Sequence, residues 1–442
     1  MANSAAAVSA PGRRHTLTLP PPVLGWAREV EALEAAGTEL GVVLWRVLRR
    51  VRAWAETVQE ERAGLFEIDK REARERLGQG CVHAPELVEA LGVFAQLIRA
   101  PERMEARQLA DACHEVHAWA EERSLVKVAM LFAEAAAVAE PDDPARANEA
   151  GRLCRRAAFD DRAASWYHRA SGLAVRHKAR QEIIRAQLGY GNLMKELGDH
   201  DEARKYFERA AQRAISTGRE RQAAEAFHDL LAIAAEVGTY SEAERYVRRA
   251  LSLYPIHHPR LPALAHDWAF LLVRSRFYTQ AIPLLEMASY RARKPELEAL
   301  FKSTLAWAVA GIGRQDQFER IEHGVNQLLL RSHEFTAAAL NHLAEGARVF
   351  GFWDRAEQYA ATSVEVAAAR KDPVIQRESS VLADKVARRE LGPREEVPPN
   401  RERLNSLTMR IEARLRQWDT PGRTEPGAVP LSTESLPERG GL

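Results

Sequence analysis

Small side chains recur at a nearly constant spacing through the middle of the chain and form a ladder. Its first position in each period is taken by Ala129, Ala163, Ala203, Ala243, Ala281, Phe318 and Ala356, at steps of 34, 40, 40, 38, 37 and 38 residues. Seven residues after each of these comes a second, mostly small residue: Ala136, Ala170, Ala210, Ala250, Ala288, Val325 and Ser363. A period of this length is typical of stacked helix pairs, because each pair must bury its apolar side against the next. We therefore predict an all-α solenoid in which these residues, the alanine ladder, lie where helices cross.

Apolar positions at helical spacing place two helices in each period. In the clearest unit a first helix ends at Gly198, and a second helix carries Ala203, Phe207 and Ala210. The next unit repeats the pattern and closes at Pro255. Glycine permits the backbone conformation that ends a helix, and proline prevents a helix from continuing. Glycines in the same register in four units argue against a chance alignment in an alanine-rich chain: Gly198, Gly238, Gly313 and Gly351.

The pattern resembles the tetratricopeptide repeat family, in which a glycine turn joins helix A to a helix B with alanine, aromatic and alanine positions. The resemblance covers about seven units: 110–143, 144–183, 184–223, 224–261, 262–298, 299–336 and 337–372. The sixth unit is the least typical, with Phe318, Glu322 and Val325 at those three positions of helix B. Most units exceed the family's usual length, so we expect longer helices or turns. The resemblance implies a right-handed superhelix whose A helices line a concave groove.

The segments that flank the repeats have a different composition. Residues 1–22 and 419–442 are rich in Pro, Ser or Gly and predict disorder, while 23–109 predict an N-terminal helical region. Within that region an apolar seam alternates steps of four and three residues, which fits a helix packed on its neighbours or a dimer seam: Leu40, Leu44, Val47, Val51, Trp54 and Val58. We expect residues 373–418, with an amphipathic helix that reaches Trp418, to cap the open end of the solenoid.

Charge and cysteine content narrow the function classes. The 442 residues include 63 Lys and Arg against 62 Asp and Glu, so no general attraction to nucleic acid or to an anionic membrane is expected. Three cysteines (Cys81, Cys113 and Cys154) without metal-ligand spacing indicate reduced thiols, and no targeting or membrane-spanning segment stands out. We therefore expect a cytoplasmic protein.

Catalytic and cofactor motifs are absent from the sequence: it has no phosphate-binding loop, dinucleotide fingerprint, nucleophile elbow or HExxH pair. His257 and His258 lie between prolines, and His114 and His117 share a helix face beside Cys113. Packed or solvated histidines explain both pairs better than a metal site does. We expect no enzyme activity, no cofactor and no metal.

The groove positions of the family give candidate binding residues here. The second and third units contribute a basic zone: Asn148, Arg152, Arg155, Arg156, Arg185, Asn192 and Lys195. The fifth and sixth contribute a mostly apolar zone: His266, Phe270, Val273, Arg274, Leu300 and Trp307. Together they suit an acidic protein or peptide segment with a hydrophobic anchor. Two other interpretations stay open: the cations pair with acids of the next unit, and Trp307 belongs to the core between repeats.

The family's clamp for a C-terminal carboxylate is missing, because Leu188 and Asp229 replace its lysine and one of its asparagines. The resemblance therefore favours a non-enzymatic scaffold or adaptor that holds another kind of protein segment.

The alternative is a peptide-responsive transcriptional regulator, as found in bacteria, with an N-terminal helix-turn-helix. Glu72–Leu77, the turn Gly78–Ala84 and Glu86–Leu97 could imitate that motif. Its turn is longer than usual, and its second helix is acidic and apolar where a DNA reader needs cations. A third interpretation, an enzyme in the N-terminal region, lacks a catalytic set.

Overall fold

In a computed structural model of the chain, residues 26–66, 77, 78, 80, 82–330, 335–398 and 401–417 are described. These residues form helices and turns and contain no strand, so the predicted all-α repeat fold is confirmed. The expectations for residues 1–22, for 419–442 and for Trp418 lie outside the described residues. No helix in the described ranges combines the length and the apolar character that crossing a membrane requires.

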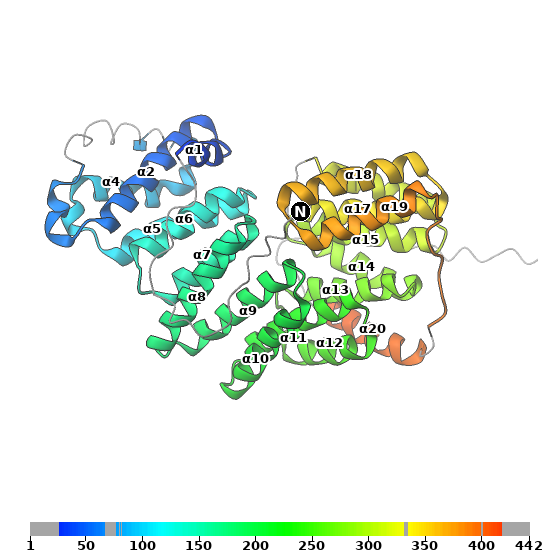
Figure 1. The fold of residues 1–442 in the computed structure, drawn as a ribbon. Helices are drawn as coiled ribbons and strands as arrows, with labels where there is room; N and C mark the ends of the chain where they lie inside the picture. The colour runs from blue at the N-terminus through cyan, green and yellow to red at the C-terminus, as the bar shows by residue number, and fades with distance from the viewer. Residues whose placement is uncertain are drawn as a thin grey trace, which may run out of the picture.

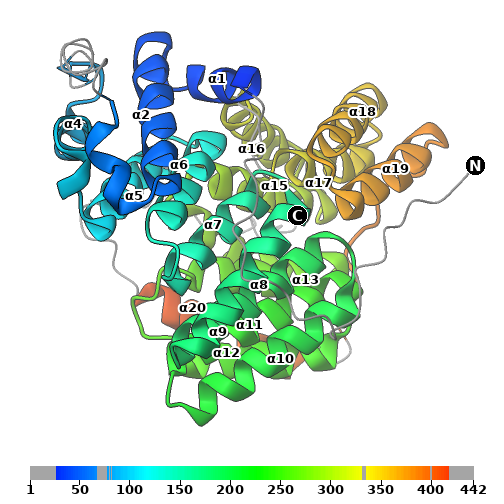
Figure 2. The ribbon, with the colours of Figure 1, turned by 60° about the vertical axis from the view of Figure 1, so that its left-hand side comes forward.

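In the described part of the chain, seven antiparallel helix pairs follow one another along an arc (Figure 1, and Figure 2 from another side). We call the first helix of each pair helix A and the second helix B. The pairs are α5 (Ala106–Glu122) with α6 (Val126–Ala139), α7 (Pro144–Arg156) with α8 (Asp160–Arg176), α9 (Arg180–Glu196) with α10 (His200–Ser216), α11 (Glu220–Val237) with α12 (Tyr240–Leu253), α13 (Leu261–Arg274) with α14 (Tyr278–Tyr290), α15 (Pro295–Gly311) with α16 (Gln315–Leu328), and α17 (Thr336–Phe350) with α18 (Trp353–Arg370).

The A helices lie on the inside of the arc. Successive A helices, from α7 to α17, pack directly against one another, whereas successive B helices in the described part of the chain make at most marginal contact. Elements on the inside of a curved stack must come closer together than those on its outside. The A helices therefore form an inner face and the B helices an outer face, as the resemblance predicted.

The alanine ladder is buried throughout. Ala163, Ala203 and Ala243 have no exposed surface, and Phe318, the large exception, is equally buried. A methyl side chain lets two helix backbones approach closely, which brings the neighbouring larger side chains into contact. The ladder therefore sets the distances between helices and takes no direct part in binding.

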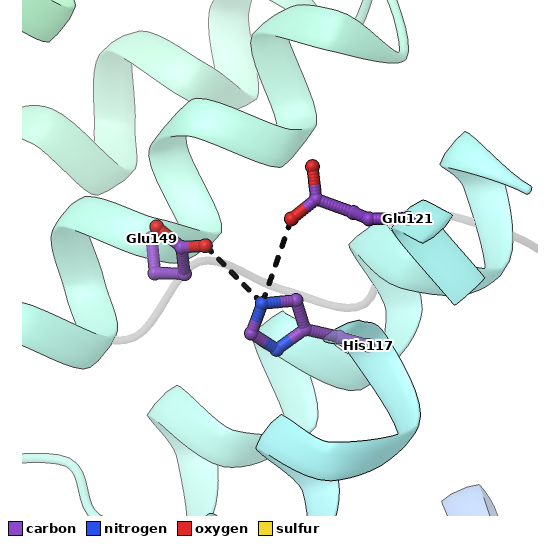
Figure 3. Close-up of side chains that lie close together, drawn as sticks. All are labelled: His117, Glu121 and Glu149. Atoms are coloured by element: carbon purple, nitrogen blue, oxygen red, sulfur yellow. Dashed lines mark hydrogen bonds and ion pairs between the residues drawn. The ribbon is translucent and has the colours of Figure 1, made fainter. Parts of the chain in front are cut away.

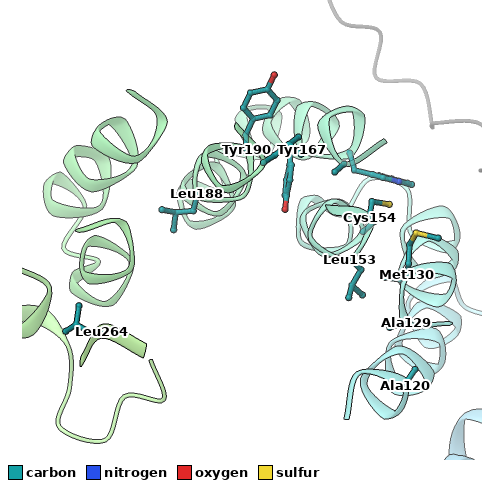
Figure 4. Packing of buried hydrophobic residues seen from close by; sticks show 14 of the residues in the cluster. Ala120, Ala129, Met130, Leu153, Cys154, Tyr167, Leu188, Tyr190 and Leu264 are labelled. Carbon is teal, nitrogen blue, oxygen red and sulfur yellow. The ribbon is translucent and has the colours of Figure 1, made fainter. Parts of the chain in front are cut away.

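Glycines on the A helices receive aromatic rings from the B helices. The ring of Tyr167 on α8 lies between α7 and α9 (Figure 4), against Gly151 and Gly189. A methyl group at Gly189 would come within 2.2 Å of Tyr167 Cε1. Phe318 on α16 faces Gly346 on α17 in the same way. The large side chain of Phe318 in the ladder therefore fits because the residue that it faces on the next A helix is a glycine.

The N-terminal helices pack on the first repeat. α2 (Thr38–Glu56) contacts α6, α4 (Val88–Arg99) contacts α5, and α1 (Trp26–Glu34) lies against α2. The apolar seam of α2 is buried within the chain from Leu40 to Trp54, while Val58 beyond its end is exposed. Between the two interpretations of this seam, the structure supports a helix packed on its neighbours.

The two C-terminal helices differ in what they cover. α19 (Pro373–Ala387) packs on α18 and α17 and caps the array as expected. α20 (Arg401–Arg416) does not cap the end: it folds back onto α13 and α14, and Arg403 pairs with Glu244 of α12. This position of α20 follows from the packing of the repeats. α12 makes little contact with α13 and leaves apolar surface at that joint. Four buried residues of α20 occupy it: Leu404, Leu407, Ile411 and Leu415.

The end of α18 and the start of α19 contact the second and third units across the arc. Arg370 Nη2 donates to the carbonyl oxygen of Arg156 over 3.4 Å. Val374 lies so close to Gly198 that a methyl group there would meet its Cγ2 at 3.3 Å. The arc therefore closes on itself, and distant parts of the array are in contact.

We predict that Gly189→Ala destabilises the protein by about 1–2 kcal/mol. Alanine favours a helix by about 1 kcal/mol, but its methyl group must displace the Tyr167 ring, and overpacking a core typically costs about 1–3 kcal/mol. Gly324→Ala on α16 is the control, because nothing lies within 4 Å of its added methyl group. The control should gain stability in urea unfolding, and adding Tyr167→Leu should rescue Gly189→Ala. Equal effects of the two alanines would contradict the glycine–aromatic packing.

Candidate functional site

The predicted basic zone is neutralised by carboxylates of neighbouring helices. Arg152 on α7 pairs with Glu121 on α5 and with Glu149 on its own helix. Arg156 also reaches Glu121, and Arg155 pairs with Glu196 on α9. The inner face thus carries much less free positive charge here than the sequence alone suggested. Of the two interpretations of these cations, pairing with acids of adjacent units is the one that the structure supports.

Burial and ion pairing act in opposite directions on these carboxyl groups. Burial raises the pKa of Glu121, but the hydrogen bond from Arg152 and the charges of Arg152 and Arg156 outweigh it, so the pKa lies below its usual value. The pKa of Glu149 is likewise held well below its usual range, because His117 and Arg152 outweigh its burial. Both groups are therefore ionised at neutral pH and bind their cations at full charge.

His117, Glu121 and Glu149 lie close enough together to be considered as metal ligands (Figure 3). The Nε2 atom of His117 is 3.2 Å from Glu149 Oε1 and 3.8 Å from Glu121 Oε2. The same two carboxylate oxygens bind Nη2 of Arg152, which lies 2.6 Å from Glu149 Oε1. A metal ion would have to displace this guanidinium and would face Arg156 as well. We therefore interpret the cluster as an ion-pair network. His117 was a candidate from the sequence, whereas its two carboxylate partners were not.

The amides of the basic zone tie successive A helices together. Nδ2 of Asn148 donates to the carbonyl and to the carboxylate of Glu182 on α9, over 3.0 and 2.9 Å. Nδ2 of Asn192 donates to Asp229 on α11 over 3.3 Å. These bonds repeat from one unit to the next, so both asparagines have a structural role whether or not they bind a ligand.

Arg185 and Lys195 are the most weakly ion-paired cations of the basic zone. Arg185 is exposed and reaches Glu182 only at 3.4 Å. Burial lowers the pKa of Lys195, but the nearby carboxylates, chiefly Glu236 and Asp229, outweigh it and raise the pKa above its usual value. Lys195 is therefore charged, and it lies among acids of the next unit.

A chain of buried polar groups runs through the A helices of units four to seven. Asp267 binds His228 with one carboxylate oxygen and His266 with the other, each at 3.0 Å. His266 Nε2 then meets Thr304 Oγ1 at 3.0 Å, and Thr304 meets His342 Nδ1 at 3.1 Å. Burial raises the pKa of Asp267, but the two histidines outweigh it and hold the pKa well below its usual range. The predicted candidate His266 is thus a member of this internal network.

The sequence carries a signal for this network in the spacing of its polar residues. His228, His266, Thr304 and His342 follow one another at intervals of 38 residues, which is the local repeat period. Polar residues in one register of successive A helices should therefore meet, just as the small residues of the ladder do.

Two half-buried aromatic side chains flank His342 on the inner face. The ring of Phe270 on α13 lies 5.4 Å from His342, and the ring of Trp307 on α15 lies 5.7 Å from it. Arg274 extends over Phe270 at 5.7 Å and also pairs with Glu378 of α19. The structure thus brings together Phe270, Arg274 and Trp307 of the predicted apolar zone. We call this group the aromatic zone.

The other two apolar candidates lie elsewhere. Val273 is completely buried and belongs to the core. Leu300 packs with Phe301 in a separate small cluster beside α14. Both were placed on the inner face by the minimal repeat, whose register does not carry over to the longer units of this chain.

Comparison with known proteins identifies the repeat. Residues 182–256, which span α9 to α12, match the sequence model of the tetratricopeptide repeat. This segment is therefore identified as tetratricopeptide repeat, and the resemblance found in the sequence is confirmed there. No curated protein matches the chain in sequence.

Three solved structures are similar at low identity. The apo form of RapI shares 12% identity, with a match covering 63% of this chain and 98% of that chain at a TM-score of 0.41. The Rap conjugation gene regulator of the plasmid pLS20, solved in complex with the Phr* peptide, shares 15% identity over 78% and 96% of the two chains, at a TM-score of 0.48. A circular tandem repeat protein shares 14% identity over 87% and 88%, at a TM-score of 0.16.

We predict that His342 makes the protein less stable as the pH falls below 6.5. Burial, together with the charges of His266 and Arg274, lowers the pKa of His342 from 6.5 to about 3. Between these values the unfolded chain binds a proton that the folded chain does not, so the free energy of unfolding falls by up to about 1.4 kcal/mol per pH unit. Above pH 6.5 this residue contributes no pH dependence.

Urea unfolding of the wild type and of His342→Gln at pH 7, 6 and 5 checks this prediction. The stability difference between the two proteins should shrink as the pH falls, because glutamine does not titrate. A constant difference would contradict the buried, neutral state of His342.

Proposed function

We propose that the protein is a non-enzymatic scaffold that holds a segment of a partner protein or peptide along its inner face. The aromatic zone carries this proposal. Phe270 and Trp307 keep part of their surface exposed side by side on the inner face, whereas most large apolar residues of the A helices are buried. Half-exposed aromatic rings are typical binding anchors, because a partner's apolar side chain can displace water from them.

The chemistry of the proposed partner follows from the same face. An apolar anchor residue would lie between Phe270 and Trp307, and backbone groups of the segment would meet Arg274 beside them. The paired arginines of the basic zone offer a partner little net charge, so we place the first contact at the aromatic zone. Arg185, Asn192 and Lys195 would contact a segment that extends toward the third unit.

The alternative, a DNA-binding regulator, gains little support from the N-terminal region. Most of its first helix, residues 72–76, lies outside the described residues. On the second helix, α4, the exposed side carries Glu89, Gln96 and a single cation, Arg99, while Phe94 and Leu97 are buried. A helix that reads DNA needs several cations or amides on its exposed side. We also propose a cytoplasmic location, in keeping with the free, buried Cys113 and Cys154.

We predict that Phe270→Ala with Trp307→Ala weakens peptide binding by about 2 kcal/mol, close to thirtyfold. The probe is a peptide selected from a displayed random library against the full-length wild-type protein, and its affinity is measured by fluorescence anisotropy. Tyr290→Ala on the outer helix α14 is the matched control and should change the affinity less than about twofold. Equal affinity of all three proteins, or failure to select any peptide, would contradict the proposal.

A further inference from the structure

Part of the unpaired positive charge of the repeat array lies on its outer face. Four exposed arginines on the B helices of units three and four have no carboxylate within ion-pair distance among the described residues: Arg209 and Arg213 on α10, and Arg245 and Arg249 on α12. We call them the outer arginine surface. They contrast with Arg152, Arg155 and Arg156 on the inner face, each of which binds a carboxylate.

Aromatic rings support three of these guanidinium groups. Arg209 lies over the ring of Tyr206 at 5.8 Å, and Arg249 lies over Phe227 at 5.9 Å. Arg245 lies over Tyr246 at 4.9 Å and also donates to its hydroxyl group over 3.1 Å. A ring that faces the flat guanidinium restricts its motion and leaves most of its N–H groups free to bind an anion. These arginines are therefore partly ordered for a partner that the described residues do not supply.

The arrangement is specific to two neighbouring units. Tyr206 and Tyr246 follow the ladder positions of units three and four by three residues. Arg209 and Arg249 follow the same positions by six residues. In unit two the matching arginine, Arg169, is buried and donates to the carbonyl of Pro141. In unit five the matching residue is Met287. The tyrosine with an exposed arginine three residues later is thus confined to units three and four when compared with units two and five.

The C-terminal helix extends the patch. α20 lies beside α12, and its exposed Arg410 lines a shallow hollow together with Leu251 and Ser252. Ser252 follows Arg249 by almost one helical turn. α20 therefore adds a fifth cation next to the outer arginine surface.

We propose that the outer arginine surface binds an acidic helical segment of a partner protein. Arg209 and Arg213, like Arg245 and Arg249, are four residues apart and so lie about 6 Å from each other along their helix. Carboxylates four residues apart on a partner helix have the same spacing, and each can take two hydrogen bonds from one guanidinium. This surface is separate from the inner face, so the proposal stands independently of the aromatic zone.

A protein partner fits this surface better than nucleic acid does. Glu202 and Glu208 are carboxylates on the same helix as Arg209, and the whole chain carries a net charge of only +1. A continuous phosphate backbone would be repelled by these acids, whereas separate carboxylates can pair with each arginine individually.

Fluorescence anisotropy with a labelled helical peptide of about 20 residues, with Glu at every fourth position, tests the proposal. The same peptide with Gln in place of Glu is the neutral comparison. Arg245→Glu with Arg249→Glu should weaken binding of the Glu peptide at least about tenfold. Arg103→Glu with Arg388→Glu is the control, because it changes the net charge equally at exposed arginines elsewhere; it should weaken binding less than about twofold.

Three results would overturn the proposal. Equal loss in the two double variants would show a net-charge effect without a site, and equal binding of the Glu and Gln peptides would exclude recognition of carboxylates. Tighter binding of an oligothymidylate of about 20 nucleotides, lost in the same variant, would assign the surface to nucleic acid. Phe270→Ala with Trp307→Ala should leave binding of the Glu peptide unchanged, which separates this site from the inner face.

Discussion

The close approach of helices at the alanine ladder is the constraint on which the rest of the structure depends. A methyl group or a hydrogen atom at each crossing fixes how near one helix lies to the next, and an aromatic ring from the neighbouring helix fills the space beside it. The pairing of Phe318 with Gly346 follows the same rule with the sizes exchanged. Because each unit contacts little beyond its neighbours, these local distances add up to the curvature of the whole arc.

That curvature decides which charges meet. On the inside of the arc the A helices are close enough for Arg152 to reach Glu121 on the preceding A helix and for Asn148 to reach Glu182 on the following one. On the outer face some B helices are also joined by ion pairs, such as Arg204 of α10 with Glu242 of α12, but Arg249 meets an aromatic ring and, among the described residues, no carboxylate. The same composition of arginine and acid thus gives a neutral inner face and a basic patch outside. We propose that Phe270 and Trp307 give the inner face its chemical specificity.

The sequence predicted the fold well because packing follows the repeat period. Each small residue of the ladder, such as Ala203, must meet another helix at the same place in every unit. The candidate site was predicted less well, because pairing between units depends on distances that the period does not give. Arg156 was expected to face a ligand and instead binds Glu121, and Val273 proved to be a core residue. The position of α20 could not be predicted either, since it depends on the reduced contact between α12 and α13.

These local distances close the arc, so that the end of α18 and the start of α19 meet units two and three. Double electron–electron resonance between spin labels at the exposed Leu197 and Gln376 measures the distance across this contact directly. The labels are placed in a variant with Cys81 replaced by serine. We predict one narrow, short distance distribution that Val374→Asp broadens and lengthens, since its carboxylate would be placed against Gly198. A broad distribution in the wild type, unchanged by Val374→Asp, would contradict the account.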